Sequence, residues 1–185
     1  MDYAYDDILY GSLSIPDWLW RLFSDPLFIR LRGISQAVLP VELNPFSTAA
    51  NRFQHSIGVW HLAHRLCLYE SFRHLAPHLP LAGLLHDAAN PPFSHVADNL
   101  LEAATGYRPE QRLRPLLLNS RLAEKIAALG GDPEYICDLV AGERKPWSDI
   151  LNGSVDLDNW DNIARYAKAR GRTVQYHPYA LADLL

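Results

Sequence analysis

A histidine and an aspartate stand side by side at His86-Asp87, directly after the apolar run of residues 81–85. Imidazole and carboxylate groups are both ligands of divalent metals. Neighbouring residues on a helix point about 100° apart, so both can hold one ion only where the helix ends and the backbone turns. The helix should end here, because Pro91 and Pro92 follow and a proline disfavours the helical conformation of the residue before it. The pair is therefore a candidate metal site.

Two further residues complete a candidate ligand set. His55 lies upstream on the inward stripe of a segment with helical periodicity, and Asp158 lies downstream in another such segment. Two imidazoles with two carboxylates suit Mn, Fe, Ni or Zn, with Mg as an alternative, and are too hard for Cu(I) or an iron–sulfur cluster. For His55 alone, a hydrogen-bonded core histidine is the competing interpretation. His55, His86, Asp87 and Asp158 are therefore candidate ligands of one divalent transition metal ion.

The sequence around these positions resembles the HD-domain superfamily and, within it, the deoxynucleoside triphosphate triphosphohydrolase (dGTPase-like) branch. The matching blocks occur in the family's order and cover most of the chain, at residues 7–15, 25–36, 51–59, 81–98 and 155–165. The resemblance implies a metal-dependent phosphohydrolase that attacks a nucleotide or nucleotide-like phosphate substrate through metal-activated water. It also implies the assignment of Asp158, the second aspartate of its motif, as the metal ligand.

The resemblance assigns roles to four more residues. Arg52 would neutralise phosphate charge with its planar donor fork, and Gln36 would contact the sugar. His95 and Asp98, three residues apart at the start of a helix, would act as acid, base or orienting groups. The competing interpretation is a surface histidine and a carboxylate that complements the helix dipole.

Several positions depart from the family pattern. Asn90 stands where the family has a catalytic histidine, and asparagine neither takes nor gives a proton at neutral pH. Pro109 stands at a second family histidine, and Asn162 and Tyr166 replace the nucleotide-stacking tyrosine and the sugar-binding aspartate. Losing a positioned acid or base costs about 10²–10⁴-fold in rate, so ordinary triphosphohydrolase activity should be weak or absent. The predicted substrate-binding set is Gln36, Arg52, Asn90, Asn162 and Tyr166.

Two other function classes stay open. The substitutions at Asn90 and Pro109 motivate a catalytically weakened HD domain that binds a nucleotide or a partner protein as a regulatory module. An iron oxygenase is the weakest alternative, because HD-domain oxygenases use two irons and further histidines between the HD pair and the last aspartate. His95 is the sole histidine of this chain in that interval.

Length and composition indicate one globular domain. The 185 residues are 49% hydrophobic and 21% charged, and the formal charge of −4 gives no reason to expect nucleic-acid binding. Cys67 and Cys137 lack metal-ligand spacing, which favours a reducing compartment. The acidic start and the lack of a long apolar run predict a cytoplasmic protein without a membrane partner. Residues 1–185 would form one HD domain, minimal or C-terminally truncated relative to longer relatives, and a homo-oligomer stays open.

Hydrophobic periodicity predicts an all-α bundle with a short extended or hairpin segment at the N-terminus. Alternation over residues 8–15 indicates that segment. Helices are predicted to open at Pro16-Asp17 and Asp25-Pro26 and to follow at 52–72, 81–87, 94–104, 109–118, 122–129, 133–141 and 156–169, with a loop at 39–50. In the last helix, four residues recur at helical steps and should share a face toward the site: Asp158, Asn162, Arg165 and Tyr166. Asp156 should be an N-cap or first-turn carboxylate, and Asp161 the partner of a nearby arginine.

Overall fold

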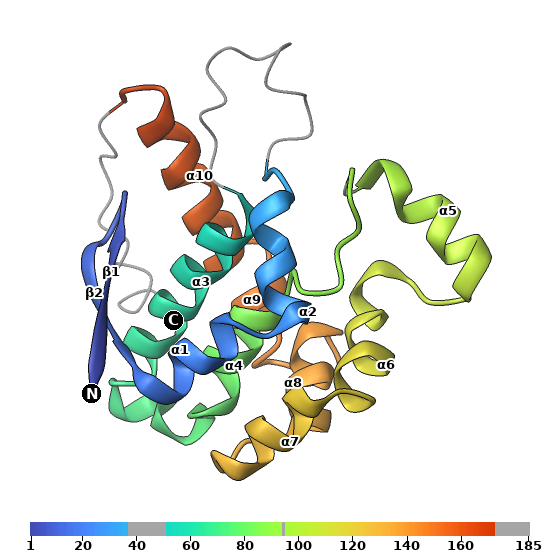
Figure 1. The fold of residues 1–185 in the computed structure, drawn as a ribbon, viewed down its shortest axis with the longest axis horizontal. Helices are drawn as coiled ribbons and strands as arrows, with labels where there is room; N and C mark the ends of the chain where they lie inside the picture. Colours follow the sequence, from blue (N-terminus) through green and yellow to red (C-terminus); the bar gives the residue numbers. More distant parts are fainter. Residues whose placement is uncertain (37–50, 94, 173–185) are drawn as a thin grey trace.

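A computed structural model describes residues 1–36, 51–93 and 95–172. Within these ranges the chain forms a helical body with one two-stranded hairpin at its N-terminus, which confirms the predicted fold class (Figure 1). The predicted loop at 39–50 lies outside the described residues. No helix in the described ranges is long and apolar enough to cross a membrane.

The hairpin pairs β1 (Asp2–Asp7) with β2 (Gly11–Pro16) in antiparallel register. Residues 8–10, at the start of the predicted extended or hairpin segment, form the turn of this hairpin. Oδ1 of Asp7 accepts hydrogen bonds from the backbone N–H groups of Leu9 (2.8 Å) and Tyr10 (3.2 Å). This local capping by an aspartate favours a turn over a continued strand. Gly11 closes the turn with φ +72°, a conformation that side-chain-bearing residues rarely adopt.

The remaining elements are helical, and their order along the chain is α1 (Asp17–Phe23), α2 (Pro26–Ile29), η1 (Arg30–Gly33), α3 (Arg52–Leu66), η2 (Glu70–Leu75), α4 (His78–Leu85), α5 (His95–Thr105), η3 (Pro109–Gln111), α6 (Leu113–Leu118), α7 (Arg121–Ala128), α8 (Pro133–Val140), α9 (Asp149–Asn152) and α10 (Leu157–Ala169), where η marks a 3₁₀ helix. The predicted helix at 52–72 is too long, because α3 ends at Leu66. The predicted helix at 81–87 begins earlier, at His78, since Pro80 falls in the first turn, where a missing N–H breaks no helical bond. The short α9 was not predicted.

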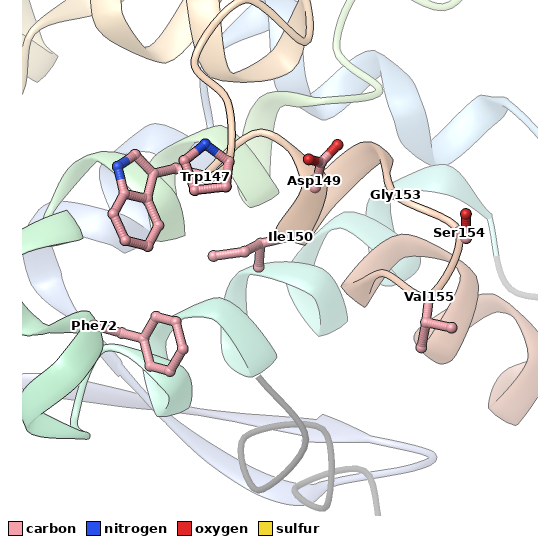
Figure 2. Close-up of a pocket in the computed structure, with 8 residues that line it drawn as sticks. Phe72, Trp147, Asp149, Ile150, Gly153, Ser154 and Val155 are labelled. Atoms are coloured by element: carbon pink, nitrogen blue, oxygen red, sulfur yellow. The ribbon is translucent and has the colours of Figure 1, made fainter.

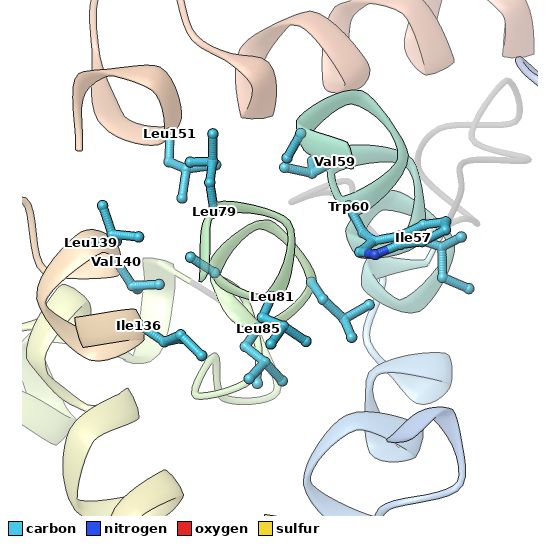
Figure 3. Close-up of a cluster of buried hydrophobic side chains, with 14 of the residues drawn as sticks. Ile57, Val59, Trp60, Leu79, Leu81, Leu85, Ile136, Leu139, Val140 and Leu151 are labelled. Carbon is cyan, nitrogen blue, oxygen red and sulfur yellow. The ribbon is translucent and has the colours of Figure 1, made fainter. Parts of the chain in front are cut away.

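Helix α4 is the centre of the core. Its side chains at Leu79, Leu81 and Leu85 lie between α3 and α8, as Figure 3 shows. A Cβ atom at Gly83 of α4 would lie 3.2 Å from the carbonyl oxygen of Val59 in α3, so this glycine permits a close approach of the two helices. That approach brings the C-terminal end of α4, with His86, toward the start of α3.

Two helix starts that carry predicted site residues are capped by side chains. Asn51 accepts a hydrogen bond from the backbone N–H of Gln54 (3.0 Å), and the Gln54 side chain accepts one from Asn51 N–H (3.3 Å) at the start of α3. Asp156 accepts from Asn159 N–H (2.7 Å) and caps α10, as predicted. These caps fix where the helices begin and therefore which way their first-turn side chains point.

A cavity of about 470 Å³ lies beside η2 and α9 (Figure 2). Its wall is largely apolar and includes Phe72, Trp147, Ile150 and Val155. Asp149 also lines it and forms an ion pair with Lys145. None of the predicted site residues lines this cavity, so the candidate site must be built elsewhere.

Candidate metal centre

Three of the predicted ligands converge from three helices. His55 lies in the first turns of α3, His86 caps the end of α4, and Asp158 lies in the first turn of α10. Oδ1 of Asp158 lies 2.8 Å from Nε2 of His55 and 3.8 Å from Nε2 of His86. One ligand atom from each residue lies within 4.8 Å of the other two. This spacing allows one ion to contact all three side chains.

Asp87 approaches the same place with its Oδ2 atom, 4.0 Å from Nε2 of His55 and 3.6 Å from Nε2 of His86. Asp87 Oδ2 and His86 Nε2 are buried and have no hydrogen-bond partner among the described residues. Leaving a buried polar atom unsatisfied costs about 1–3 kcal/mol. A divalent ion between these atoms would satisfy both, and the mixed imidazole–carboxylate donor set fits such an ion. The four predicted ligands are thus brought together.

Both histidines are held through Nδ1, which leaves Nε2 to face the ligand set. Nδ1 of His86 lies 2.8 Å from the carbonyl oxygen of Gly83. Nδ1 of His55 lies 2.7 Å from Oδ2 of Asp161, inside the protein. Because a carbonyl or carboxylate oxygen only accepts, the proton of each ring stays on Nδ1. This is the arrangement that metal-ligating histidines commonly adopt.

His55 and Asp158 shift each other's pKa. Burial by itself lowers the pKa of His55, but hydrogen bonds to Asp158 and Asp161 outweigh it and raise the pKa to about 10. Burial raises the pKa of Asp158, but the hydrogen bond from His55 and the nearby positive charges bring it well below its usual value. In the metal-free protein His55 is therefore an imidazolium between two carboxylates. An ion bound at Nε2 takes the place of that proton.

Arg52 and Asn90, both predicted to bind substrate, contact Asp87, one of the candidate metal ligands. Nη1 of Arg52 lies 2.6 Å from Oδ1 of Asp87, and the Asn90 side-chain amide donates to the same oxygen. The loop that carries Asn90 is held from outside by Arg30, whose Nη2 donates to the carbonyl oxygens of Ala88 (2.6 Å) and Asn90 (2.7 Å). These contacts orient Asp87 with Oδ2 toward the two histidines.

Gln36 lies next to the start of α3. Ser35 forms a β-bridge with Asn51, the N-cap of α3, which places the adjacent Gln36 near Arg52. The Oε1 atom of Gln36 is buried and has no hydrogen-bond partner within the described ranges. A hydroxyl group of a bound molecule would satisfy it.

The two residues predicted to handle protons lie on α5, which projects from the body on the side of α6 (Figure 1). Oδ1 of Asp98 accepts a hydrogen bond from Nη1 of Arg112 (2.7 Å) in a largely buried ion pair. His95 begins α5, and its side chain lies outside what the structure describes. A role of His95 and Asp98 in proton transfer stays a prediction.

The α10 residues that were predicted to share a face toward the site differ in their burial and in their contacts. Arg165 is buried, but its guanidinium group contacts Asp161 (Nε to Oδ2, 2.6 Å) and Asp7 (Nη2 to Oδ2, 2.8 Å). The predicted pairing of Asp161 with an arginine is thereby confirmed. Tyr166 is 43% exposed and stacks under the guanidinium group of Arg170, at 3.8 Å. Asn162 is half-buried.

The sequence analysis did not identify the hydrogen-bond partners that hold the His55 ring. Asp161 was assigned an arginine partner but not His55, and Tyr10, which donates from its hydroxyl to Asp161 Oδ1 (2.8 Å), was not singled out. The matching block at residues 7–15 contains Tyr10 and could have drawn attention to it. Spacing could not, because Tyr10 and Asp161 are 151 residues apart in the chain.

The chain is similar in sequence to known proteins. The deoxynucleoside triphosphate triphosphohydrolase SAMHD1 of Gallus gallus is 35% identical to this chain, over 88% of this chain and 33% of its own length. The SAMHD1 homolog of Dictyostelium discoideum is 26% identical over 91% of this chain and 36% of its own. This chain thus spans about a third of the length of these relatives.

A solved structure is also similar. The crystal structure of a hypothetical protein from Aquifex aeolicus covers 100% of this chain with a TM-score of 0.73 and 26% identity, and this chain covers 50% of that one. The model of the HD domain family matches residues 52–166, a range that holds all four predicted ligands. By this match and by the ligands that its fold assembles, the chain belongs to the HD domain family.

Proposed function

We propose that this chain is a metal-dependent phosphohydrolase that acts on a nucleotide or nucleotide-like phosphate substrate. The observation that carries the proposal is the convergence of two buried, unsatisfied ligand atoms, His86 Nε2 and Asp87 Oδ2, with His55 and Asp158. The relatives named as deoxynucleoside triphosphate triphosphohydrolases support a nucleotide substrate.

His55, His86, Asp87 and Asp158 would hold one divalent ion. When bound, the ion supplies a Lewis acid for a phosphate oxygen and lowers the pKa of water so that a nucleophile forms near neutral pH. Arg52 keeps Asp87 oriented and adds a fixed positive charge that neutralises phosphate. Beside it, Gln36 accepts a hydrogen bond from a sugar hydroxyl.

Groups on α5 and α10 would complete the substrate site. His95 and Asp98 would hold or move the proton that goes to the leaving oxygen. Asn162 and Tyr166 would shape the sugar and base pocket on the exposed side of α10. Because both positions depart from the resembled family's pattern, this chain would have its own base and sugar preference.

The test is hydrolysis by the purified, metal-loaded protein. The protein is loaded separately with Mn²⁺, Fe²⁺, Ni²⁺, Zn²⁺ and Mg²⁺ and incubated with a panel of ribonucleotides, deoxyribonucleotides and phosphate esters. Anion-exchange chromatography then separates phosphate, pyrophosphate and triphosphate, which identifies the bond that is cut. A metal-loaded, folded protein that releases none of the three from any member of the panel would contradict the proposal.

A second candidate function is a nucleotide-binding regulatory module with little turnover. The ion pair of Asp98 with Arg112 favours it, because it engages the carboxylate that proton transfer would need. Equilibrium dialysis with deoxynucleoside triphosphates separates the two functions. Tight binding without turnover that persists in Asp98→Ala supports the module, whereas turnover that is lost in Asp98→Ala removes it.

A further inference from the structure

We propose that Asp161 is a positioning residue of the metal centre and that Tyr10, from the N-terminal hairpin, holds it in place. Asp161 would fix the His55 ring through Nδ1, so that Nε2 faces the other ligands. This inference rests on the metal site of the proposed function, and it assigns Asp161 a role that its pairing with an arginine does not explain.

The carboxylate of Asp161 is completely buried and saturated with donors. Its Oδ2 atom accepts from Nδ1 of His55 (2.7 Å) and Nε of Arg165 (2.6 Å). Its Oδ1 atom accepts from the hydroxyl of Tyr10 (2.8 Å) and Nη2 of Arg165 (3.1 Å). Four donors on two oxygens fix the orientation of the carboxylate. The hydrogen bond from Nδ1 to this fixed carboxylate in turn fixes the orientation of the His55 imidazole.

A glycine in α3 makes room for this arrangement. A Cβ atom at Gly58 would lie 2.0 Å from Oδ1 of Asp161 and 2.4 Å from Nη2 of Arg165. Real Cβ atoms essentially never come this close to another heavy atom. A side chain at residue 58 would therefore displace the Asp161 carboxylate or the Arg165 guanidinium, so the ion pair that supports His55 occupies space that the glycine leaves open.

The network continues into the N-terminal hairpin. Nη2 of Arg165 also lies 2.8 Å from Oδ2 of Asp7, while Oδ1 of Asp7 caps the turn that carries Tyr10. Figure 1 shows the hairpin alongside the body, next to α3 and α10. Two side chains of the hairpin thus contact the network behind His55. Asp7 pairs with Arg165, and Tyr10 donates to Asp161, which holds His55.

The two ligand histidines differ in what lies behind them. Nδ1–H of His86 donates a hydrogen bond to a neutral backbone carbonyl, whereas Nδ1–H of His55 donates one to a carboxylate. A carboxylate behind the ring makes the imidazole a stronger donor to a metal and fixes its tautomer. The ion pair of Asp161 with Arg165 does not require a hydrogen bond from His55, yet the same Oδ2 atom accepts one. The shared Oδ2 atom is the observation that points to the metal centre.

The test is a titration of the metal-free 185-residue chain with Co²⁺, followed by its visible absorption. Asp161→Asn should weaken Co²⁺ binding about 10–100-fold, the range found for partners of ligand histidines, and should shift the absorption bands. Asp25→Asn is the matched control, because Asp25 is also a buried, ion-paired carboxylate, bonded to Lys125 at 3.0 Å. It should lower the melting temperature while leaving Co²⁺ affinity and spectrum unchanged. A folded Asp161→Asn protein with wild-type affinity and spectrum would overturn the proposal.

A second variant covers the case in which Asp161→Asn does not fold. Tyr10→Phe keeps the ring and removes only the hydroxyl donor, and it should weaken Co²⁺ binding by a smaller factor. Unchanged affinity in Tyr10→Phe would then overturn the proposal. Wild-type protein that binds Co²⁺ in this Asp161-dependent way yet releases no phosphate, pyrophosphate or triphosphate from the panel would remove the hydrolase function and leave the positioning role. Wild-type protein that binds no Co²⁺ would overturn the positioning role itself.

Discussion

Nη1 of Arg52 lies 2.6 Å from Oδ1 of Asp87, and both side chains are almost fully buried. The contact uses one carboxylate oxygen and leaves the other, Oδ2, facing the two ligand histidines. The charge of Asp87 is therefore compensated from one side by an arginine that is always present and from the other by an ion that can be removed. Arg52 should therefore contribute more to the stability of the metal-free protein than to that of the metal-bound protein.

Arg52→Gln should destabilise the metal-free protein by about 3–5 kcal/mol, because it leaves Asp87 as a buried carboxylate without its cation. The loss should be smaller with Mn²⁺ bound, since the ion then compensates the same charge. Urea unfolding with and without Mn²⁺ measures both values. Arg114→Gln, which removes a half-exposed ion-pair partner, should cost no more than about 1 kcal/mol and should not respond to Mn²⁺. An equal loss for Arg52→Gln in both conditions would contradict the idea.

Metal content should depend on Asp87 in a similarly direct way. We expect about one ion per chain in wild-type protein after dialysis, and a collapse of that number in Asp87→Ala, because the remaining ligands lose a charge and an anchoring point. Elemental analysis by plasma mass spectrometry gives the count. Asp149→Ala, a carboxylate on the wall of the separate cavity, should keep the wild-type value. Two irons per chain would instead revive the oxygenase hypothesis.

The four candidate ligands could be selected from the sequence because they sit in short local patterns. The His86-Asp87 pair, the run around His55 and the aspartates of α10 each match a motif block. Helical periodicity also predicted that His55 is buried, and the cap role of Asp156 followed from its place before a helix. Local patterns thus predicted most of the helices and the four candidate ligands that the fold brings together.

Contacts between distant segments could not be predicted in this way. Asp161 holds His55 across 106 residues, and Arg30 holds the carbonyl of Asn90 across 60. Hydrophobic periodicity assigns a face to each helix, but it does not say which polar groups on two buried faces will meet. The helix predicted at 52–72 is too long for a related reason, because its apolar pattern continues into η2, which packs Phe72 and Leu75 on the same core.

The stability of the metal-free protein should fall as the pH rises from 6.5 toward 10. Burial disfavours the imidazolium of His55, but its bonds to Asp158 and Asp161 dominate and raise its pKa from 6.5 to about 10. A raised pKa contributes stability that is fully present below pH 6.5 and is lost as the pH passes the folded value, at up to about 1.4 kcal/mol per pH unit.

Urea unfolding after chelation of metals, at pH 6.5 and at pH 10, measures this loss. His55→Gln is the control, because every other titrating group remains, including the two cysteines whose pKa burial raises to about 11. The wild type should lose more stability than His55→Gln across the interval. Identical pH dependence in the two proteins would mean that His55 does not carry a proton in the metal-free fold.

Asn90→His should raise hydrolysis of ordinary deoxynucleoside triphosphates. In the resembled branch a catalytic histidine stands at this position, and an imidazole has a pKa near the working pH, whereas the amide of Asn90 only donates to Asp87. A histidine whose Nδ1–H keeps that contact would leave Nε2 for proton transfer. Asn119→His, on the exposed end of α6, is the control for adding an imidazole elsewhere and should change nothing.

The triple variant Asn90→His, Pro91→Gly and Asn162→Tyr is the stricter form of this experiment. Pro91 stiffens the loop where the family has glycine, and Asn162 occupies the position of the family's nucleotide-stacking tyrosine, so the single change restores the acid–base group without its surroundings. Steady-state rates on the four deoxynucleoside triphosphates should rise further than in Asn90→His, with the metal count unchanged. If the triple variant keeps its metal and its fold but gains no rate on any of them, the pocket serves a different ligand. The family resemblance would then describe the metal centre of this protein and not its substrate.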